Sequence, residues 1–444
     1  MGEESGWSQW WRDPARLFGV LGLACGLALV LLLPPYQVAD EWRHFYRAYQ
    51  LSQGHMLGEG LGDTLPAAIQ RLTWETEHRL GVPMQRPRPW SEMRSILAGM
   101  AELRIDEHDL TYAPFPTVLY APVPYLGVTA GVALGRLATD RPLVLMYSGR
   151  LGGLLLALAL TWYAIRVTPL GRWAFFLVAM TPVVSYQRAG LSADSLINAL
   201  AMVQVALVLA AAAGPPGRTL SGRDLGRLGI VTTALCLCKQ AYLVLPFLGW
   251  LIPKSRFRQP ADRRLVRLWL PLLGWTAAAA WSVLVMGTSY RPMLPGSDAQ
   301  GQLAFILGHP LAFLAAFGRD LTGKGLPYLH ELLGTLGWLD LPAPQELVLL
   351  HAGALLAASL LAATGPFRPT AAIRLWTLAV LAASVGLVWT LMYLWWAPVG
   401  APNLPGMQGR YFTPLLPLLP PLLALPLASR PAGRLWPLLP AVYG

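Results

Sequence analysis

The sequence predicts an all-α polytopic membrane protein with about 11–12 apolar helical segments, since apolar runs near the length that a bilayer requires recur along the whole chain. Hydrophobic residues make up 55% of its 444 residues and charged residues only 13%. Soluble domains carry about 25% charged residues. The three cysteines lie within apolar runs, as small packing residues do, and indicate neither disulfides nor a metal site.

Basic residues explain the formal net charge of +11. They cluster in short loops between apolar runs, which is typical of cytoplasmic loops and of contact with anionic membrane lipids. We find no nucleic-acid signal. The loop residues are Arg218, Arg223, Arg227, Lys254, Arg256, Arg258, Arg263, Arg264, Arg267, Arg368 and Arg374.

The first apolar run, residues 17–33, follows Arg12 and Arg16, so it should begin in the cytoplasm and end outside. Residues 37–114 then form a first outer loop with no segment apolar enough to cross. Amphipathic pieces within it predict interfacial, juxtamembrane helices. They cover residues 41–53, 64–80 and 91–103.

The number of crossings between residues 117 and 190 is ambiguous. Apolar runs cover 117–134, 143–165 and 173–186, and counting each as a crossing places Asp194 inside. The arginines after the next run require Asp194 to lie outside. We therefore expect one piece between 117 and 186 to be broken or re-entrant, which is tolerated where backbone lines a cavity.

The remainder continues the same single integral membrane domain, residues 1–444. The run 228–252 is interrupted at Lys239 and Gln240, which predicts a hairpin of short helices with Lys239 in a structural or snorkelling role. Residues 287–345 form a second outer loop rich in Pro and Gly. The other runs cover residues 269–286, 347–363, 375–395, 413–428 and an incomplete 435–443.

Ionisable residues gather directly after the first apolar run. Six lie between Asp40 and Arg47, and in a helix Asp40, His44 and Arg47 would share one face. Such charges cost free energy at a membrane unless they are solvated, paired or part of a functional site. Asp40 is the candidate general base, with Glu41 beside it, and Arg43 and His44 are candidates for substrate binding. The alternative is an interfacial helix with an acidic N-terminal cap.

Three further polar groups should reach the same side of the membrane. They are Asp194, Lys324, and the group Gln408, Arg410 and Tyr411. A guanidinium suits phosphate oxygens, and a lipid-linked phosphate would arrive at the depth of Arg410. The alternatives are a snorkelling arginine, an acidic helix cap at Asp194 and a solvated loop lysine. Asp40 and Asp194 together are candidate ligands for Mg²⁺ or Mn²⁺.

Five motifs resemble the bacterial membrane family called domain of unknown function 2142. They cover residues 34–49 (PPYQVADEWRHFYRAY), 191–200 (LSADSLINAL), 239–243 (KQAYL), 334–340 (GTLGWLD) and 408–417 (QGRYFTPLLP). That family in turn resembles the GT-C class of integral-membrane glycosyltransferases. Their hallmark is an acidic residue in the first outer loop, the place of Asp40, and Asp194 loosely matches a second acidic position.

The resemblance implies a multi-pass protein of the bacterial inner membrane with its active face outside the cytoplasm. It would transfer a sugar from a polyprenyl-phosphate donor to an envelope glycan, lipid or protein. The alternatives are a transporter or flippase of lipid-linked sugars, an assembly partner, or a scaffold. A transporter should carry polar residues near the middle of the membrane and internal symmetry, whereas the charges here lie at the ends of runs.

Overall fold

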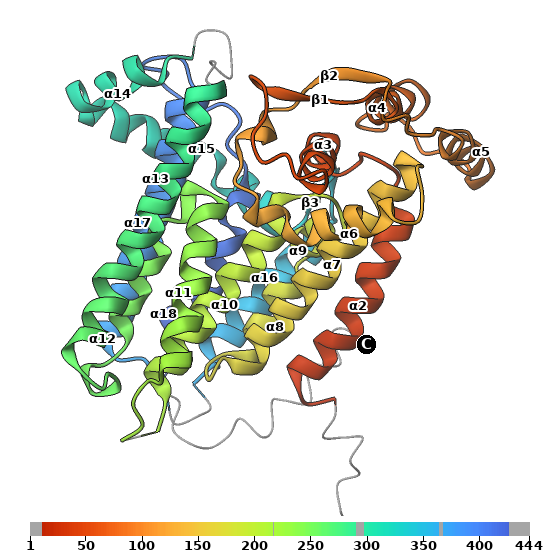
Figure 1. Cartoon of the computed structure of the whole chain (residues 1–444). Coiled ribbons are helices and arrows are strands. Elements are labelled where there is room, and N and C mark those ends of the chain that lie inside the picture. The colour runs from red at the N-terminus through yellow and green to blue at the C-terminus, as the bar shows by residue number, and fades with distance from the viewer. Residues whose placement is uncertain (1–10, 216, 290–296, 364–366, 426–444) are drawn as a thin grey trace, which may run out of the picture.

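The computed structural model describes residues 11–215, 217–289, 297–363 and 367–425. Its helices form an elongated bundle (Figure 1), which confirms the predicted all-α polytopic membrane class. Within these described ranges, five helices are long and apolar enough to cross a bilayer, or up to six if the bent pair α14 (Ala299–Gly308) and α15 (Pro310–Leu333) counts as one. The five are α2 (Pro14–Leu32), α7 (Pro142–Val167), α10 (Ala193–Ala213), the stretch Pro260–Val285 and α17 (Ala371–Trp396).

Proline breaks other apolar runs into short pieces. Helices α8 (Arg172–Met180) and α9 (Pro182–Ala189) meet at Thr181, whose ψ of 132° is extended because Pro182 follows it. The final described segment is a 3₁₀ helix, η7 (Gly409–Leu418), with Pro414 and Pro417 inside it, followed by α18 (Leu419–Leu423). The predicted run 435–443 lies outside the described residues.

Residues 117–134 contain no helix long enough to cross a bilayer. They form two 3₁₀ turns, η1 (Pro116–Leu119) and η2 (Val123–Tyr125), and the 11-residue helix α6 (Leu126–Arg136). That helix is about 16 Å long, too short for a bilayer core of about 30 Å. Both ends of the segment contact α3: Arg47 donates to the Tyr120 carbonyl at 2.7 Å, and Arg136 donates to the Ser52 carbonyl at 3.0 Å.

The predicted hairpin between residues 228 and 252 is present, with its turn at Lys239. Helix α11 (Gly222–Cys238) ends there, and η3 (Gln240–Tyr242) and η4 (Leu245–Leu251) return. The two ends of the hairpin meet where Leu220 donates to the Arg256 carbonyl at 2.8 Å. The next pieces are η5 (Lys254–Arg256), α12 (Pro260–Arg264), the π-helical turn η6 (Leu265–Trp269) and α13 (Leu270–Ser289).

Residues 37–114 cover one end of the bundle, here called the loop end (Figure 1). The three predicted amphipathic pieces are helices, and a two-stranded antiparallel sheet that the sequence did not predict joins them. The elements are α3 (Glu41–Ser52), β1 (Gly62–Pro66), α4 (Ala67–Arg79), α5 (Trp90–Ala101) and β2 (Leu110–Pro114). The opposite end, with α12 and the turn before α11, is here called the basic end.

The predicted second outer loop folds largely as two helices. Helix α15 packs against the residues that follow α17, since Lys324 donates to the Leu404 carbonyl at 3.0 Å and Arg319 donates to that of Pro402. The loop therefore lies beside the segment 397–408. Its elements, with the helix that follows, are α14 (Ala299–Gly308), α15 (Pro310–Leu333), β3 (Thr335–Leu336), β4 (Leu341–Pro342) and α16 (Gln345–Leu360).

Candidate functional site

Glu41 is fully buried in an ion pair with Arg150 of α7. Its two oxygens lie 2.8 and 2.7 Å from the Arg150 nitrogens Nε and Nη2, and they also accept the backbone N–H groups of Tyr36 and Leu191, both at 2.9 Å. Arg150 donates further to carbonyls at the end of α2 and just beyond it. Every oxygen of Glu41 thus has protein donors, which suits positioning rather than contact with a substrate.

Asp40 is differently placed, although it is the adjacent residue. It occupies the N-cap position of α3 with φ of 60°, a left-handed conformation that is uncommon for a residue other than glycine. Its side chain makes no capping hydrogen bond, so the simple cap interpretation is not what the geometry shows. The carboxylate pairs instead with Arg43, which also lies over the Trp42 ring, and the Asp40 side chain is 34% exposed.

His44 lies one turn into α3 beneath Asp40 and is buried. Its Nδ1 lies 2.7 Å from the Tyr125 hydroxyl, and its ring contacts that of Tyr120 with centroids 6.5 Å apart. The segment 116–125, which the sequence suggested as the start of a membrane span, thus brings two tyrosines against α3. Sequence analysis missed both tyrosines, because nothing in their spacing marks them as neighbours of His44.

Asp194 belongs to the first turn of α10, where Ser192 supplies the cap by accepting the Asp194 N–H at 3.1 Å. The Asp194 carboxylate is therefore turned to other partners. Lys239, at the turn of the hairpin, approaches its Oδ1 at 3.5 Å, and Gln187 donates to its Oδ2 at 3.3 Å. Lys239 was expected to be structural, but the hairpin brings it to the same end as Asp194.

Arg410 lies in the first turn of η7. Thr413 fastens this segment to α10 by donating to the Asn198 side chain at 2.7 Å, and the Tyr242 hydroxyl donates to the Tyr411 carbonyl at 2.9 Å. Among the residues that the structure describes, Arg410 forms no ion pair, and its Nε is buried without a hydrogen-bond partner. Gln408 beside it has a buried side-chain oxygen that also lacks a partner within the described chain.

Charged groups from several of these segments lie close enough to His44 to influence its pKa. Burial, the largest influence, lowers the pKa of His44 to about 4; Asp40 and Asp194 act in the opposite direction, and Arg410 and Lys239 in the same direction. Four segments distant in sequence therefore surround one histidine. We call this set the α3–α10 polar cluster: Asp40, His44, Tyr120, Tyr125, Asp194, Lys239, Arg410 and Tyr411.

Lys324 lies outside this cluster. It pairs with the buried Asp320 one turn earlier on α15, at 3.1 Å, and Asp320 also accepts from the Trp389 indole at 3.0 Å. We assign this arrangement a structural role, because the Asp320 carboxylate is shared between helices α15 and α17. Trp338, in the turn between β3 and β4, donates to the Tyr36 carbonyl at 3.2 Å and so reaches the segment before α3.

The residues present do not fit a resident Mg²⁺ or Mn²⁺ at Asp40 and Asp194. Each carboxylate already faces a cation of the protein, Arg43 or Lys239, where a divalent ion would be repelled. Within the described ranges, no group of three or more histidine, cysteine, aspartate or glutamate side chains could hold a metal. We derive no chemical step through a metal ion.

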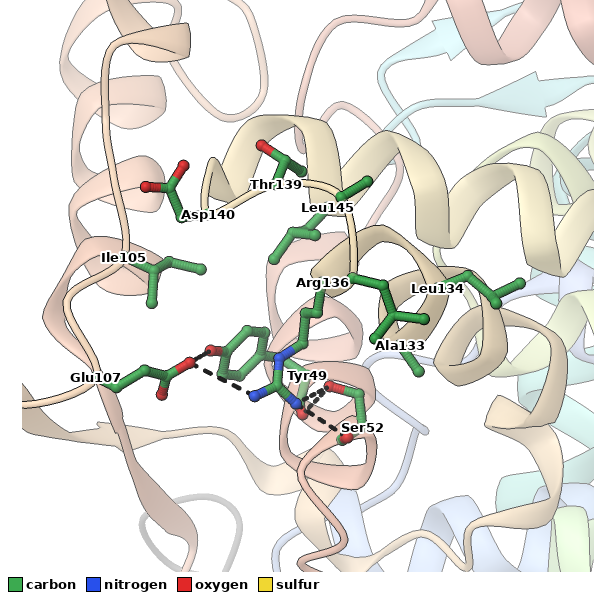
Figure 2. A pocket seen from close by; sticks show the side chains of 12 residues that line it. Tyr49, Ser52, Ile105, Glu107, Ala133, Leu134, Arg136, Thr139, Asp140 and Leu145 are labelled. Atoms are coloured by element: carbon green, nitrogen blue, oxygen red, sulfur yellow. Dashed lines mark hydrogen bonds and ion pairs between the residues drawn. The ribbon is translucent and has the colours of Figure 1, made fainter.

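A cavity of about 840 Å³ lies at the other end of α3 (Figure 2). It is lined by Tyr49 and Ser52 of α3, by Glu107, by Arg136 at the end of α6 and by Asp140. Glu107 accepts from the Tyr49 hydroxyl at 3.2 Å and lies 3.5 Å from Arg136, so these polar groups satisfy one another. None of the candidate site residues predicted from the sequence lines this cavity.

The bundle and its cluster define a class: a multi-pass helical membrane protein that gathers acids, bases and tyrosines at one end. The chain belongs to the family of predicted membrane proteins called domain of unknown function 2142 (DUF2142), whose model matches residues 23–419. The matched range contains the entire α3–α10 polar cluster. No curated protein and no solved structure matches the chain.

Proposed function

We propose that this protein is a glycosyltransferase of GT-C type that moves a sugar from a polyprenyl-phosphate donor to a hydroxyl of an envelope glycan, lipid or protein. The reaction would take place at the outer face of the bacterial inner membrane. The observation that supports it best is the presence, in one cluster, of a partly exposed carboxylate without a capping role and a guanidinium without an ion pair.

Asp40 is the general base in this proposal. It takes the proton of the acceptor hydroxyl while that oxygen bonds to the anomeric carbon of the sugar. The bond between that carbon and the phosphate oxygen breaks, and the polyprenyl phosphate leaves with the electron pair. A single displacement of this kind inverts the configuration at the sugar carbon. Arg43 holds the carboxylate in one orientation.

Arg410 is the group that stabilises charge on the departing phosphate. Preorganised charges of this kind usually make the largest contribution to catalysis. Lys239 lies 4.6 Å from the centre of the Tyr411 ring and adds positive charge on the same side. In this proposal His44, Gln408 and Tyr120 bind sugar hydroxyls. We assign Glu41 to positioning, because its oxygens have protein donors, and we leave Lys324 outside the reaction.

The test is transfer of labelled sugar from polyprenyl-phosphate donors by the purified protein. Asp40→Asn should lower the rate by about 10²–10⁴-fold, the usual contribution of a general base. Glu59→Gln removes an exposed carboxylate from the same loop and should leave the rate unchanged. Transfer that Asp40→Asn does not affect removes Asp40 as the base. Movement of the lipid between leaflets without sugar transfer supports the flippase alternative instead.

A further inference from the structure

A second, smaller cavity of about 160 Å³ lies at the basic end of the bundle, far from the α3–α10 polar cluster along α10. Its apolar wall comes from Val167 at the end of α7, Leu207 of α10 and Leu228 of α11. The charged residues in its lining are three arginines and one aspartate. One water molecule requires about 10–15 Å³ of such cavity volume, so the cavity has room for a group larger than a water molecule, such as a phosphate.

Arg256 builds one side of this cavity. Its guanidinium donates to the carbonyls of Ala211 and Pro215 at 2.7 and 3.0 Å, and also to that of Arg218. It thereby satisfies carbonyls at the end of α10 that have no partner within the helix. The same contacts hold the turn that follows α10 in place, and with it Arg218.

Arg218 and Arg227 supply the positive charge that a ligand in the cavity could meet. In the described part of the chain neither forms an ion pair, and neither side chain donates a hydrogen bond. Asp224 lies between them but is engaged by the cap of α11, where its carboxylate accepts the N–H and the hydroxyl of Ser221 at 2.9 and 2.8 Å. The cavity therefore presents two guanidinium groups that form no ion pair next to an apolar wall, with Asp224 as the nearby opposite charge.

We propose that this cavity binds the phosphate headgroup of an anionic phospholipid of the leaflet at the basic end. Guanidinium forks match phosphate oxygens. The apolar wall belongs to helices α7 and α10, which are long enough to cross the membrane, so the bound phosphate would sit where lipid headgroups meet acyl chains. This site is independent of the proposed transfer reaction, because it lies at the opposite end of the bundle.

The experiment compares lipid binding by the purified full chain using native mass spectrometry, with phosphatidylglycerol and phosphatidylcholine of equal chain length. The variant R218Q/R227Q removes both guanidinium groups that form no ion pair. The matched control R223Q/R258Q removes two exposed arginines from the same end that do not line the cavity. Each variant's melting temperature is measured to verify folding, and the single variants R218Q and R227Q replace the double variant if it fails to fold.

Wild type and R223Q/R258Q should retain phosphatidylglycerol over phosphatidylcholine, and R218Q/R227Q should bind it at least about tenfold more weakly, as loss of hydrogen bonds to a charged group implies. Equal loss in both double variants would overturn the proposal in favour of diffuse attraction. Full displacement of the lipid by millimolar inorganic phosphate would also overturn it, because the site would then take free phosphate.

Discussion

Arg150 and Glu41 form a fully buried ion pair, with 2.7 Å between Nη2 and Oε2, that ties together three parts of the chain. The arginine donates to the Leu33 and Pro34 carbonyls at the end of α2, and the glutamate accepts the Leu191 N–H just before α10. Asp40 follows the first of these segments and Asp194 the second. The pair therefore links the two segments that carry the acidic residues of the cluster.

Removing one partner of this pair should destabilise the protein strongly. Glu41→Gln leaves the Arg150 guanidinium buried without a counter-charge, and such losses cost about 3–5 kcal/mol. The measurement is the free energy of unfolding in detergent. Glu107→Gln, which breaks a partly exposed pair with Arg136, should cost no more than about 1 kcal/mol.

The double variant E41Q/R150M distinguishes charge from packing. It removes both buried charges, and replacement of a whole buried pair by residues of similar volume is often close to neutral. We expect it to be more stable than Glu41→Gln alone. A double variant that is less stable by the sum of both losses would show that the pair is not a coupled unit.

The sequence predicted the helical membrane class, the three helices of the first loop, the hairpin at Lys239 and the arrival of Asp40, Asp194 and Arg410 at one end. Each of these predictions depends on local hydrophobicity or on the positions of arginines, and both can be taken directly from one sequence. The second run, 117–134, was ambiguous because it is hydrophobic enough to be counted as a membrane crossing. Prolines at 116, 122 and 124 shorten its helix to α6.

Partners within the cluster were harder to predict. Glu41 and Asp40 are adjacent and equally acidic, yet only the packing of α7 assigns one to Arg150 and leaves the other partly exposed. Lys239 meets Asp194 across 45 residues, and Tyr125 meets His44 across 81. Charge patterns report which end of the membrane a residue reaches, but tertiary packing decides its neighbours there.

Arg410 provides a test of how the donor phosphate is bound. Arg410→Gln should lower kcat/KM by about 10²–10³-fold, comparable with loss of one preorganised donor to a developing oxyanion. Arg410→Lys keeps the charge but not the planar fork, so we expect partial activity. The kinetics are measured with varied polyprenyl-phosphate sugar. Equal activity of Gln and Lys variants would argue that Arg410 meets no phosphate.

Chelation tests the interpretation of the acidic residues. Because Asp40 faces Arg43 and Asp194 faces Lys239, we expect transfer to continue at the same rate after treatment with EDTA. The rate is measured before treatment, after treatment and after addition of Mg²⁺ or Mn²⁺. A rate that falls on chelation and returns with either ion would mean that the carboxylates rearrange to hold a metal when the substrate binds.

His44 makes stability depend on pH. Its pKa falls from its ordinary value near 6.5 to about 4 because it is buried, so the folded state binds its proton less readily than the unfolded state. The stabilising contribution is complete above pH 6.5 and is lost as the pH falls toward 4, by up to about 3 kcal/mol. His44→Gln should show a correspondingly smaller decrease in the free energy of unfolding over this range, while His108→Gln, which changes an exposed histidine, should follow the wild type. Parallel curves for wild type and His44→Gln would show that another group is responsible for the acid sensitivity.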